Sequence, residues 1–325
     1  MDSPNRHLHN IDIGNNSQDD VTGTVPQWKE KKHMAIVVTT PTGHIGRKIV
    51  EYLLDQNAEV AVIVRDPAKL APEVRERAIV HQGDLYDTAF VQKVTEGADA
   101  LFWLTPPNYT APDWKASYVD SAASAVAAIN ANRLPYVIHL SSAGADRSSG
   151  FGPVSFLHLV ENALNETDAH VLHLRPTYFY ENYLSNLDTI KTHGAIYSPI
   201  PASISYPMIA TKDIAAVAAR RLQAKDWSGK EIMGLHGPAE QPTFGEAATI
   251  IGEAIGKPIQ YIEVPLESVK PQLLQIGFSE SVASIYPELL DALARNEQPA
   301  EPRTPETTTP TTLREWATET LRPLI

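Results

Sequence analysis

A glycine-containing turn, Thr42-Gly43-His44-Ile45-Gly46, is the segment of this sequence whose residue types best suit ligand binding. An apolar β-branched run at residues 36–39 precedes it and an amphipathic stretch at 45–55 follows, which predicts a strand, a turn and a helix. A helix N-terminus offers unpaired backbone N–H groups and a partial positive charge, which together suit a pyrophosphate. Gly43 and Gly46 allow the ligand and the strand to approach closely. The pattern favours a nucleotide-phosphate site, although any turn between a strand and a helix can carry two glycines.

Two neighbouring positions refine this prediction. Thr40 stands where the usual three-glycine pattern has its first glycine, and the sequence does not decide whether it tightens the turn or blocks a pyrophosphate. A second apolar run, 60–64, ends on Arg65, where NAD-binding proteins usually carry Asp or Glu. An arginine there suits a 2′-phosphate, so NADP(H) is favoured over NAD(H). The alternative is a solvated surface arginine, since Asp66 dilutes its charge.

Strands and helices alternate from residue 34 to residue 176. Uniformly apolar runs such as 100–104 and 136–140 indicate strands buried on both faces, as in a parallel sheet. The predicted fold class is therefore α/β, a Rossmann-type doubly wound parallel sheet with a smaller α+β C-terminal lobe. The predicted strands lie near residues 34–39, 60–64, 78–80, 100–104, 136–140 and 170–174, and the helices near 45–55, 87–96, 113–132 and 154–166.

The domain plan has three parts. Residues 1–33 are polar and without a sustained period, which predicts a disordered extension. Residues 34–176 form the predicted NADP-binding Rossmann core. Residues 177–325 are predicted to form mostly a substrate-binding lobe, with a segment at about 207–236 returning to the core. Within that lobe, the Pro- and Thr-rich stretch 297–312 reads as a linker.

Composition limits the function. A formal net charge of −12 over 325 residues argues against nucleic-acid binding. The chain has no cysteine, hence no disulfide or thiol chemistry. No segment is long and apolar enough to predict a membrane span, so we expect a soluble, cytoplasmic protein. His170 and His173 show no ligand pattern with a carboxylate, and no metal is expected.

With these motifs in place, the chain from Met34 to about Arg322 resembles the NmrA-like group of atypical short-chain dehydrogenases. Seven segments carry the resemblance in order: Thr-Gly-His-Ile-Gly-Arg, Val-Arg-Asp-Pro, Gly-Asp-Leu, Leu-Thr-Pro-Pro, His-Leu-Ser-Ser-Ala-Gly, Leu-Arg-Pro-Thr-Tyr-Phe-Tyr-Glu-Asn and Thr-Lys-Asp-Ile-Ala. The group includes NADPH-dependent quinone and imine reductases and NADP-sensing regulators without enzyme activity. The resemblance implies that residues 42–46 hold the pyrophosphate and Arg65 the 2′-phosphate. It also implies that Asp84 and Leu85 flank the adenine, that Thr105 and Pro106 line the ribose near the nicotinamide, and that Ser141 and Pro176 to Tyr178 lie beyond them.

The catalytic residues are less clearly marked. Common short-chain enzymes use Ser with a Tyr-x-x-x-Lys pair, and no such pair follows Ser141 or Ser142. His158 is the natural candidate for a proton donor or ribose anchor because the free pKa of a histidine side chain lies near neutrality, and Tyr178 is the second catalytic candidate. The alternative for His158 is an ordinary helix-face histidine. Glu161, one turn along, could orient it, although a surface glutamate is the simpler interpretation.

An aromatic group is predicted to border the substrate pocket, where flat or cationic organic molecules suit aromatic walls. Its members are Tyr109, Tyr178, Tyr180 and Tyr183, and the alternative is core packing between the lobes. The favoured function is an NADPH-dependent oxidoreductase that passes hydride to an enone, quinone or iminium. Secondary metabolism is one setting that such a reaction suits. The partner is then a small-molecule substrate, and the protein a monomer or homodimer. The alternatives are a non-catalytic NADP(H) sensor and a biosynthetic cyclase or isomerase that uses the fold as a scaffold.

Overall fold

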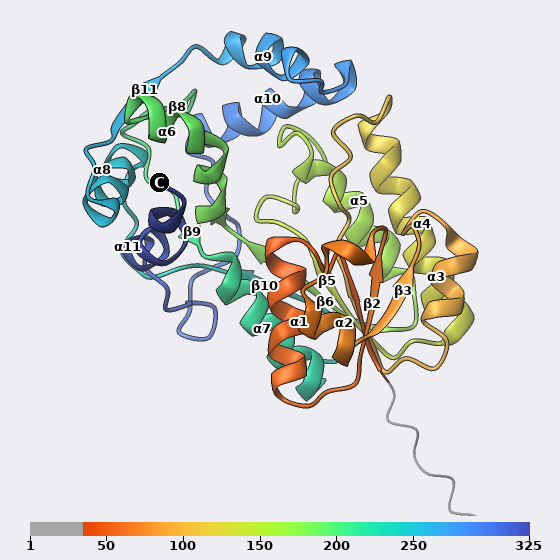
Figure 1. The fold of residues 1–325 in the computed structure, drawn as a ribbon. Helices are drawn as coiled ribbons and strands as arrows, with labels where there is room; N and C mark the ends of the chain where they lie inside the picture. The colour runs from red at the N-terminus through yellow and green to blue at the C-terminus, as the bar shows by residue number, and fades with distance from the viewer. Residues whose placement is uncertain (1–34) are drawn as a thin grey trace, which may run out of the picture. The chain divides into compact units, whose positions relative to one another are not determined.

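The computed structural model describes residues 35–325, so the predicted disordered extension at 1–33 lies outside the described residues. Its centre is a seven-stranded sheet in the order β10-β6-β5-β4-β1-β2-β3, in which every neighbouring pair is parallel (Figure 1). The strands are β1 Ile36–Thr39, β2 Val60–Val64, β3 Ile79–Gln82, β4 Ala100–Trp103, β5 Tyr136–Leu140, β6 His170–Pro176 and β10 Lys230–Leu235. The doubly wound parallel sheet predicted from the sequence is confirmed.

Helices cover both faces of this sheet, as Figure 1 shows. One apolar cluster joins the sheet to α1 (His44–Asp55), α2 (Pro72–Arg77) and α7 (Thr211–Ala224). A second joins the opposite face to α3 (Thr88–Val94), α4 (Trp114–Asn132) and α5 (Val154–Asn165). The central strands are apolar on both sides because both of their faces are buried in this way.

The C-terminal half adds a smaller lobe with its own apolar core. Two short parallel pairs, β7 with β9 and β8 with β11, lie among its helices. The lobe elements are β7 Tyr178–Phe179, α6 Leu187–His193, β8 Ala195–Ser198, β9 Met208–Ile209, α8 Phe244–Ile255, β11 Gln260–Glu263, α9 Val269–Gln275, α10 Glu280–Ala294 and α11 Leu313–Trp316. No described helix has the length and apolar character that a membrane crossing requires.

The stretch at 297–312, predicted as a linker, is instead bonded to the core along its length; we call it the C-terminal strap. The backbone of His236 donates to Thr307 O at 2.9 Å and accepts from Thr309 N at 2.8 Å. Farther along, the Asp213 carboxylate accepts from the backbone N–H of Thr311 at 3.0 Å and from its hydroxyl at 2.7 Å. Asp213 therefore anchors the strap.

Candidate functional site

The turn between β1 and α1 presents an open helix N-terminus at the carboxyl edge of the sheet. Gly43 is the N-cap of α1, with φ −80° and ψ 168°, and among the described residues no side chain caps it. Thr42, Gly43 and His44 are exposed, and the first helical turn carries no acidic residue. The free N–H groups and the positive end of the helix dipole therefore face solvent, which suits an anionic ligand.

Thr40 takes the backbone conformation that a glycine would adopt without steric cost. Its φ is +52°, in the left-handed region, and its carbonyl accepts from Gly43 N at 3.1 Å. Its hydroxyl oxygen is buried and has no hydrogen-bond partner among residues 35–325. Thr40 thus tightens the turn, and its hydroxyl does not project into the exposed face at the start of α1.

Gly46 is where the helix meets the strand. A Cβ placed on it would lie 2.2 Å from Thr40 O, whereas a Cβ on Gly43 would lie 3.6 Å from the same atom. The two glycines therefore have different roles: Gly46 permits helix–strand contact, and Gly43 keeps the exposed face open. Ile45, between them, is only 5% exposed and packs in the core, so it can reach a ligand only through its backbone.

Arg65, directly after β2, is exposed, and its guanidinium has no ion-pair partner within the described part of the chain. The Asp66 carboxylate, expected to dilute its charge, turns away to accept from Ala68 N at 3.0 Å. Arg65 is therefore an available cation at the carboxyl end of the strand beside β1, where a 2′-phosphate would need one.

The remaining predicted binding residues follow the next strands. Asp84 is exposed and accepts from Tyr86 N at 3.1 Å, whereas Leu85 lies in the core. The hydroxyl oxygens of Thr105 and Ser121 are hydrogen-bonded at 3.0 Å, and Pro106 is half-buried. Pro176 is the buried last residue of β6. These residues share one edge of the sheet, and their contacts with a cofactor stay predictions.

A buried ionic network underlies Ser141, directly after β5. The Ser141 hydroxyl donates to Glu161 at 2.5 Å, and the Arg175 guanidinium donates twice to Glu161, at 2.9 and 2.5 Å, and once to Glu301 of the strap, at 2.5 Å. Burial lowers the pKa of Arg175, but the two carboxylates raise it by more, so the guanidinium stays charged. Sequence reasoning missed Arg175 and Glu301, and the interpretation of Glu161 as a surface residue was wrong, since it is 3% exposed.

His158 lies on α5, half-buried, and its Nδ1 donates to Ala145 O at 2.9 Å. Because a carbonyl oxygen only accepts, Nδ1 carries a proton and Nε2 is the atom left for a ligand. Glu161 bonds to Ser141 and Arg175 and does not orient His158. The catalytic role of His158 stays a prediction.

The four tyrosines do not form one aromatic wall. Tyr109 is 39% exposed and stacks on Phe278 with ring centroids 4.6 Å apart. Tyr180 and Tyr183 are 4% and 2% exposed and belong to the core of the lobe, which favours the packing alternative for both. Tyr178 packs edge-on against Phe244, and burial raises the pKa of its hydroxyl far above the usual value, so it cannot ionise near neutral pH.

The family model described as NmrA-like matches residues 32–317. The chain belongs to the NmrA-like family. A curated relative, the NAD(P)H azoreductase of Xenophilus azovorans, is 27% identical over 256 residues, which cover 78% of this chain and 85% of the relative. The NADPH complex of quinone oxidoreductase QOR2 from Escherichia coli superposes with a TM-score of 0.72 at 21% identity, covering 88% of this chain and 99% of that one. The negative transcriptional regulator NmrA in complex with NADP superposes with a TM-score of 0.66 at 14% identity, covering 89% and 96%.

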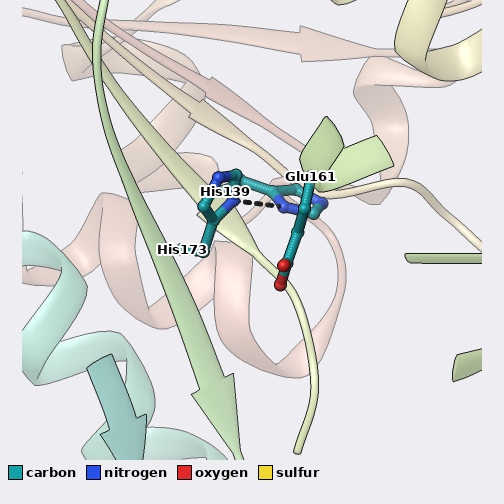
Figure 2. Close-up of side chains that lie close together, drawn as sticks. All are labelled: His139, Glu161 and His173. Atoms are coloured by element: carbon teal, nitrogen blue, oxygen red, sulfur yellow. Dashed lines mark hydrogen bonds between the residues drawn. The ribbon is translucent and has the colours of Figure 1, made fainter. Parts of the chain in front are cut away.

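This NmrA-like chain also holds a pair of buried histidines beside the network of Ser141, Glu161 and Arg175. His139 and His173 sit side by side on β5 and β6 with their Nδ1 atoms 3.1 Å apart. Together with Glu161 they form a group whose potential ligand atoms lie within 4.8 Å of one another. Figure 2 shows the two rings joined by their hydrogen bond, with the Glu161 side chain beside them, and the planes of the rings are nearly perpendicular, at 88°.

Hydrogen bonding accounts for this group without a metal ion, except that His139 Nε2 is buried and has no partner among the described residues. Asn165 Oδ1 accepts from His173 Nε2 at 3.0 Å, so His173 Nδ1 accepts from His139 Nδ1. Both Glu161 oxygens already accept from the Arg175 guanidinium. A bound cation would have to displace that guanidinium from a buried site, at a large electrostatic cost.

The histidine pair predicts how stability responds to pH. Burial lowers the pKa of His173 to about 4, with Glu161 opposing and Arg175 and Lys230 adding to the shift. Between pH 6.5 and 4 the unfolded chain therefore binds more protons than the folded one, so the free energy of unfolding falls as pH falls through this window. We expect a slope of up to about 1.4 kcal/mol per pH unit from this residue, flattened in His173→Gln. Urea unfolding at pH 5.0, 5.75 and 6.5 measures it, and equal slopes in the two proteins would contradict the assignment.

Proposed function

We propose that this protein is an NADPH-dependent oxidoreductase that transfers hydride to a small organic acceptor. The observation that carries the proposal pairs the N-terminus of α1 with the exposed guanidinium of Arg65 on the next strand end. Within residues 35–325, no side chain caps the first and no carboxylate pairs with the second. One suits a pyrophosphate and the other a 2′-phosphate. The azoreductase and quinone oxidoreductase relatives support the same reaction class.

In this proposal the cofactor supplies the hydride, and the chain binds and orients. The start of α1 and Arg65 hold the phosphates. Thr105, Ser141 and Pro176, at the ends of β4, β5 and β6, border the nicotinamide end. His158, with Nδ1 anchored on a carbonyl, is the candidate to exchange a proton through Nε2. An azo compound, quinone, enone or iminium fits as acceptor. An iminium becomes a neutral amine on taking a hydride, whereas each of the other three is left with a negative charge that a proton must neutralise.

Replacing Arg65 by alanine tests the cofactor assignment. We expect NADPH binding to weaken by about 1–3 kcal/mol, because a charge-assisted contact with the 2′-phosphate is lost, and NADH binding to stay nearly unchanged. Titration of nicotinamide fluorescence measures both. Arg314→Ala, an exposed arginine on α11 of the lobe, is the matched control and should bind both cofactors like the wild type. Equal losses for NADPH and NADH in Arg65→Ala would contradict the assignment.

The second candidate function is an NADP(H) sensor without turnover. The missing Tyr-x-x-x-Lys pair and the regulator NmrA bound to NADP favour it. Oxidation of NADPH, followed at 340 nm with azo, quinone, enone and iminium acceptors, separates the two functions. Turnover supports the oxidoreductase, and tight NADPH binding without turnover across the panel supports the sensor. Product formation without consumption of NADPH would instead indicate an isomerase or cyclase.

A further inference from the structure

The Ser141 hydroxyl has its proton committed to the protein interior. The partner atom is a carboxylate oxygen of Glu161, 2.5 Å away, and an ionised carboxylate can only accept. The same carboxylate receives two N–H groups of Arg175, which supply its counter-charge and fix its plane. All three residues are at most 5% exposed, so water does not compete for these bonds.

This arrangement decides whether the Ser141 hydroxyl donates a hydrogen bond to a ligand or accepts one. A serine hydroxyl has one proton and two lone pairs, and with the proton used it can only accept further hydrogen bonds. Ser141 is also held by its backbone, because its N–H donates to Leu174 O at 2.8 Å. Its oxygen is thus a fixed acceptor at the carboxyl end of β5, beside the strand ends where an open parallel sheet binds its ligand.

We propose that Glu161 is a positioning residue that makes Ser141 an acceptor at the nicotinamide end of the site, so that Ser141 binds an N–H or O–H donor and does not deliver a proton to the substrate. The inference rests on the proposed function. The hydrogen-bond donor is either the carboxamide of the cofactor or an N–H or O–H group of the organic substrate. The Ser141 oxygen can accept from either. The reaction proton must then come from another group, for which His158 is available.

The first test compares wild type with Ser141→Ala. We expect the variant to bind NADPH about tenfold more weakly, the loss of one good hydrogen bond, and the pH profile of kcat to keep its shape, because Ser141 does not supply the reaction proton. A large fall in kcat with unchanged NADPH affinity would overturn the proposal, because it would make Ser141 a proton donor. A change in thermal stability alone would overturn it as well. If the hydrogen-bond donor belongs to the organic substrate, Ser141→Ala raises the KM for that substrate and leaves the Kd for NADPH unchanged. The reduced 3-acetylpyridine analogue of NADPH, which lacks the amide N–H, checks the first source. A carboxamide contact makes Ser141→Ala weaken the binding of NADPH but not that of the analogue, whereas a contact with the substrate leaves the binding of both cofactors unchanged.

The second test asks whether Glu161 acts through Ser141. Glu161→Gln should weaken the same binding step, and this effect should vanish when Ser141 is already alanine. Glu301→Gln is the matched control, because it removes the other carboxylate of the same arginine without touching Ser141, and its ligand affinity should stay that of the wild type. Equal effects of Glu161→Gln in both backgrounds would overturn the proposal. Failure of wild-type protein to bind NADPH would instead overturn the proposed function, and the inference with it.

Discussion

Gly46→Ala will abolish NADPH binding and destabilise the protein by about 3 kcal/mol or more, the scale of severe overpacking in a well-packed interior. The added Cβ would lie 2.2 Å from the carbonyl oxygen and 2.8 Å from the carbonyl carbon of Thr40. Both are backbone atoms, so no side chain can move aside to relieve the clash. The start of α1 must separate from the end of β1, and the N–H groups that form the phosphate site move with it. Urea unfolding and an NADPH titration measure the two effects.

Gly43→Ala is the control for this prediction, since it adds the same methyl group three residues earlier. Its Cβ would lie 3.6 Å from Thr40 O, an ordinary van der Waals contact, and its φ of −80° suits any L-residue. The fold should therefore keep nearly its full stability, while any loss of NADPH affinity reports the ligand's approach to the turn. Similar unfolding midpoints for the two variants would show that helix and strand adjust more easily than the geometry indicates.

The parts of the fold that the sequence predicted best are those whose signal is local. The runs at β1, β2 and β4 are apolar because both faces of these strands are buried, and that pattern is legible without any partner. The two-residue strands β7 and β9 were missed because they exist only through pairing with each other, thirty residues apart along the chain. The strap was mistaken for a linker for the same reason: its Pro and Thr content says nothing about the carboxylate of Asp213 that binds Thr311.

Among the site residues too, those with a local sequence signal were predicted and those that depend on a distant partner were not. The turn at Gly43 and Gly46 and the exposed Arg65 follow from motif and spacing, and the structure places all three at one edge of the sheet. Glu161 could not be assigned, because helical spacing pairs it with His158 whereas its partner is Arg175 on the neighbouring strand. The one available signal was Arg175 itself, since a charged residue at the end of an otherwise apolar strand must be paired when it is buried.

Arg175→Ala will cost about 3–5 kcal/mol of unfolding free energy at neutral pH, the range observed when one partner of a buried ion pair is removed. The substitution leaves the Glu161 carboxylate buried and takes from Glu301 its guanidinium partner. Among residues 35–325, the Ser141 hydroxyl is then the one group that donates to Glu161. The strap is then released at one of its anchors. Because a buried carboxylate without its cation has a raised pKa, the deficit should shrink as pH falls toward 5 and protonation neutralises the two side chains. Urea unfolding at pH 7 and pH 5 measures both the size and the trend.

Arg295→Ala provides the control, because Arg295 also faces two carboxylates, Asp291 and Glu297, but its side chain is half exposed. Water screens those pairs, so the expected loss is at most about 1 kcal/mol, with little dependence on pH. Both arginines face two carboxylates, so the difference between the two losses of unfolding free energy reports the effect of burial and not the number of ion pairs. A loss for Arg175→Ala no larger than that for Arg295→Ala would mean that water reaches Glu161 once the guanidinium is gone. In that case the carboxylate could no longer fix the Ser141 proton, and the acceptor role of Ser141 would lose its physical basis.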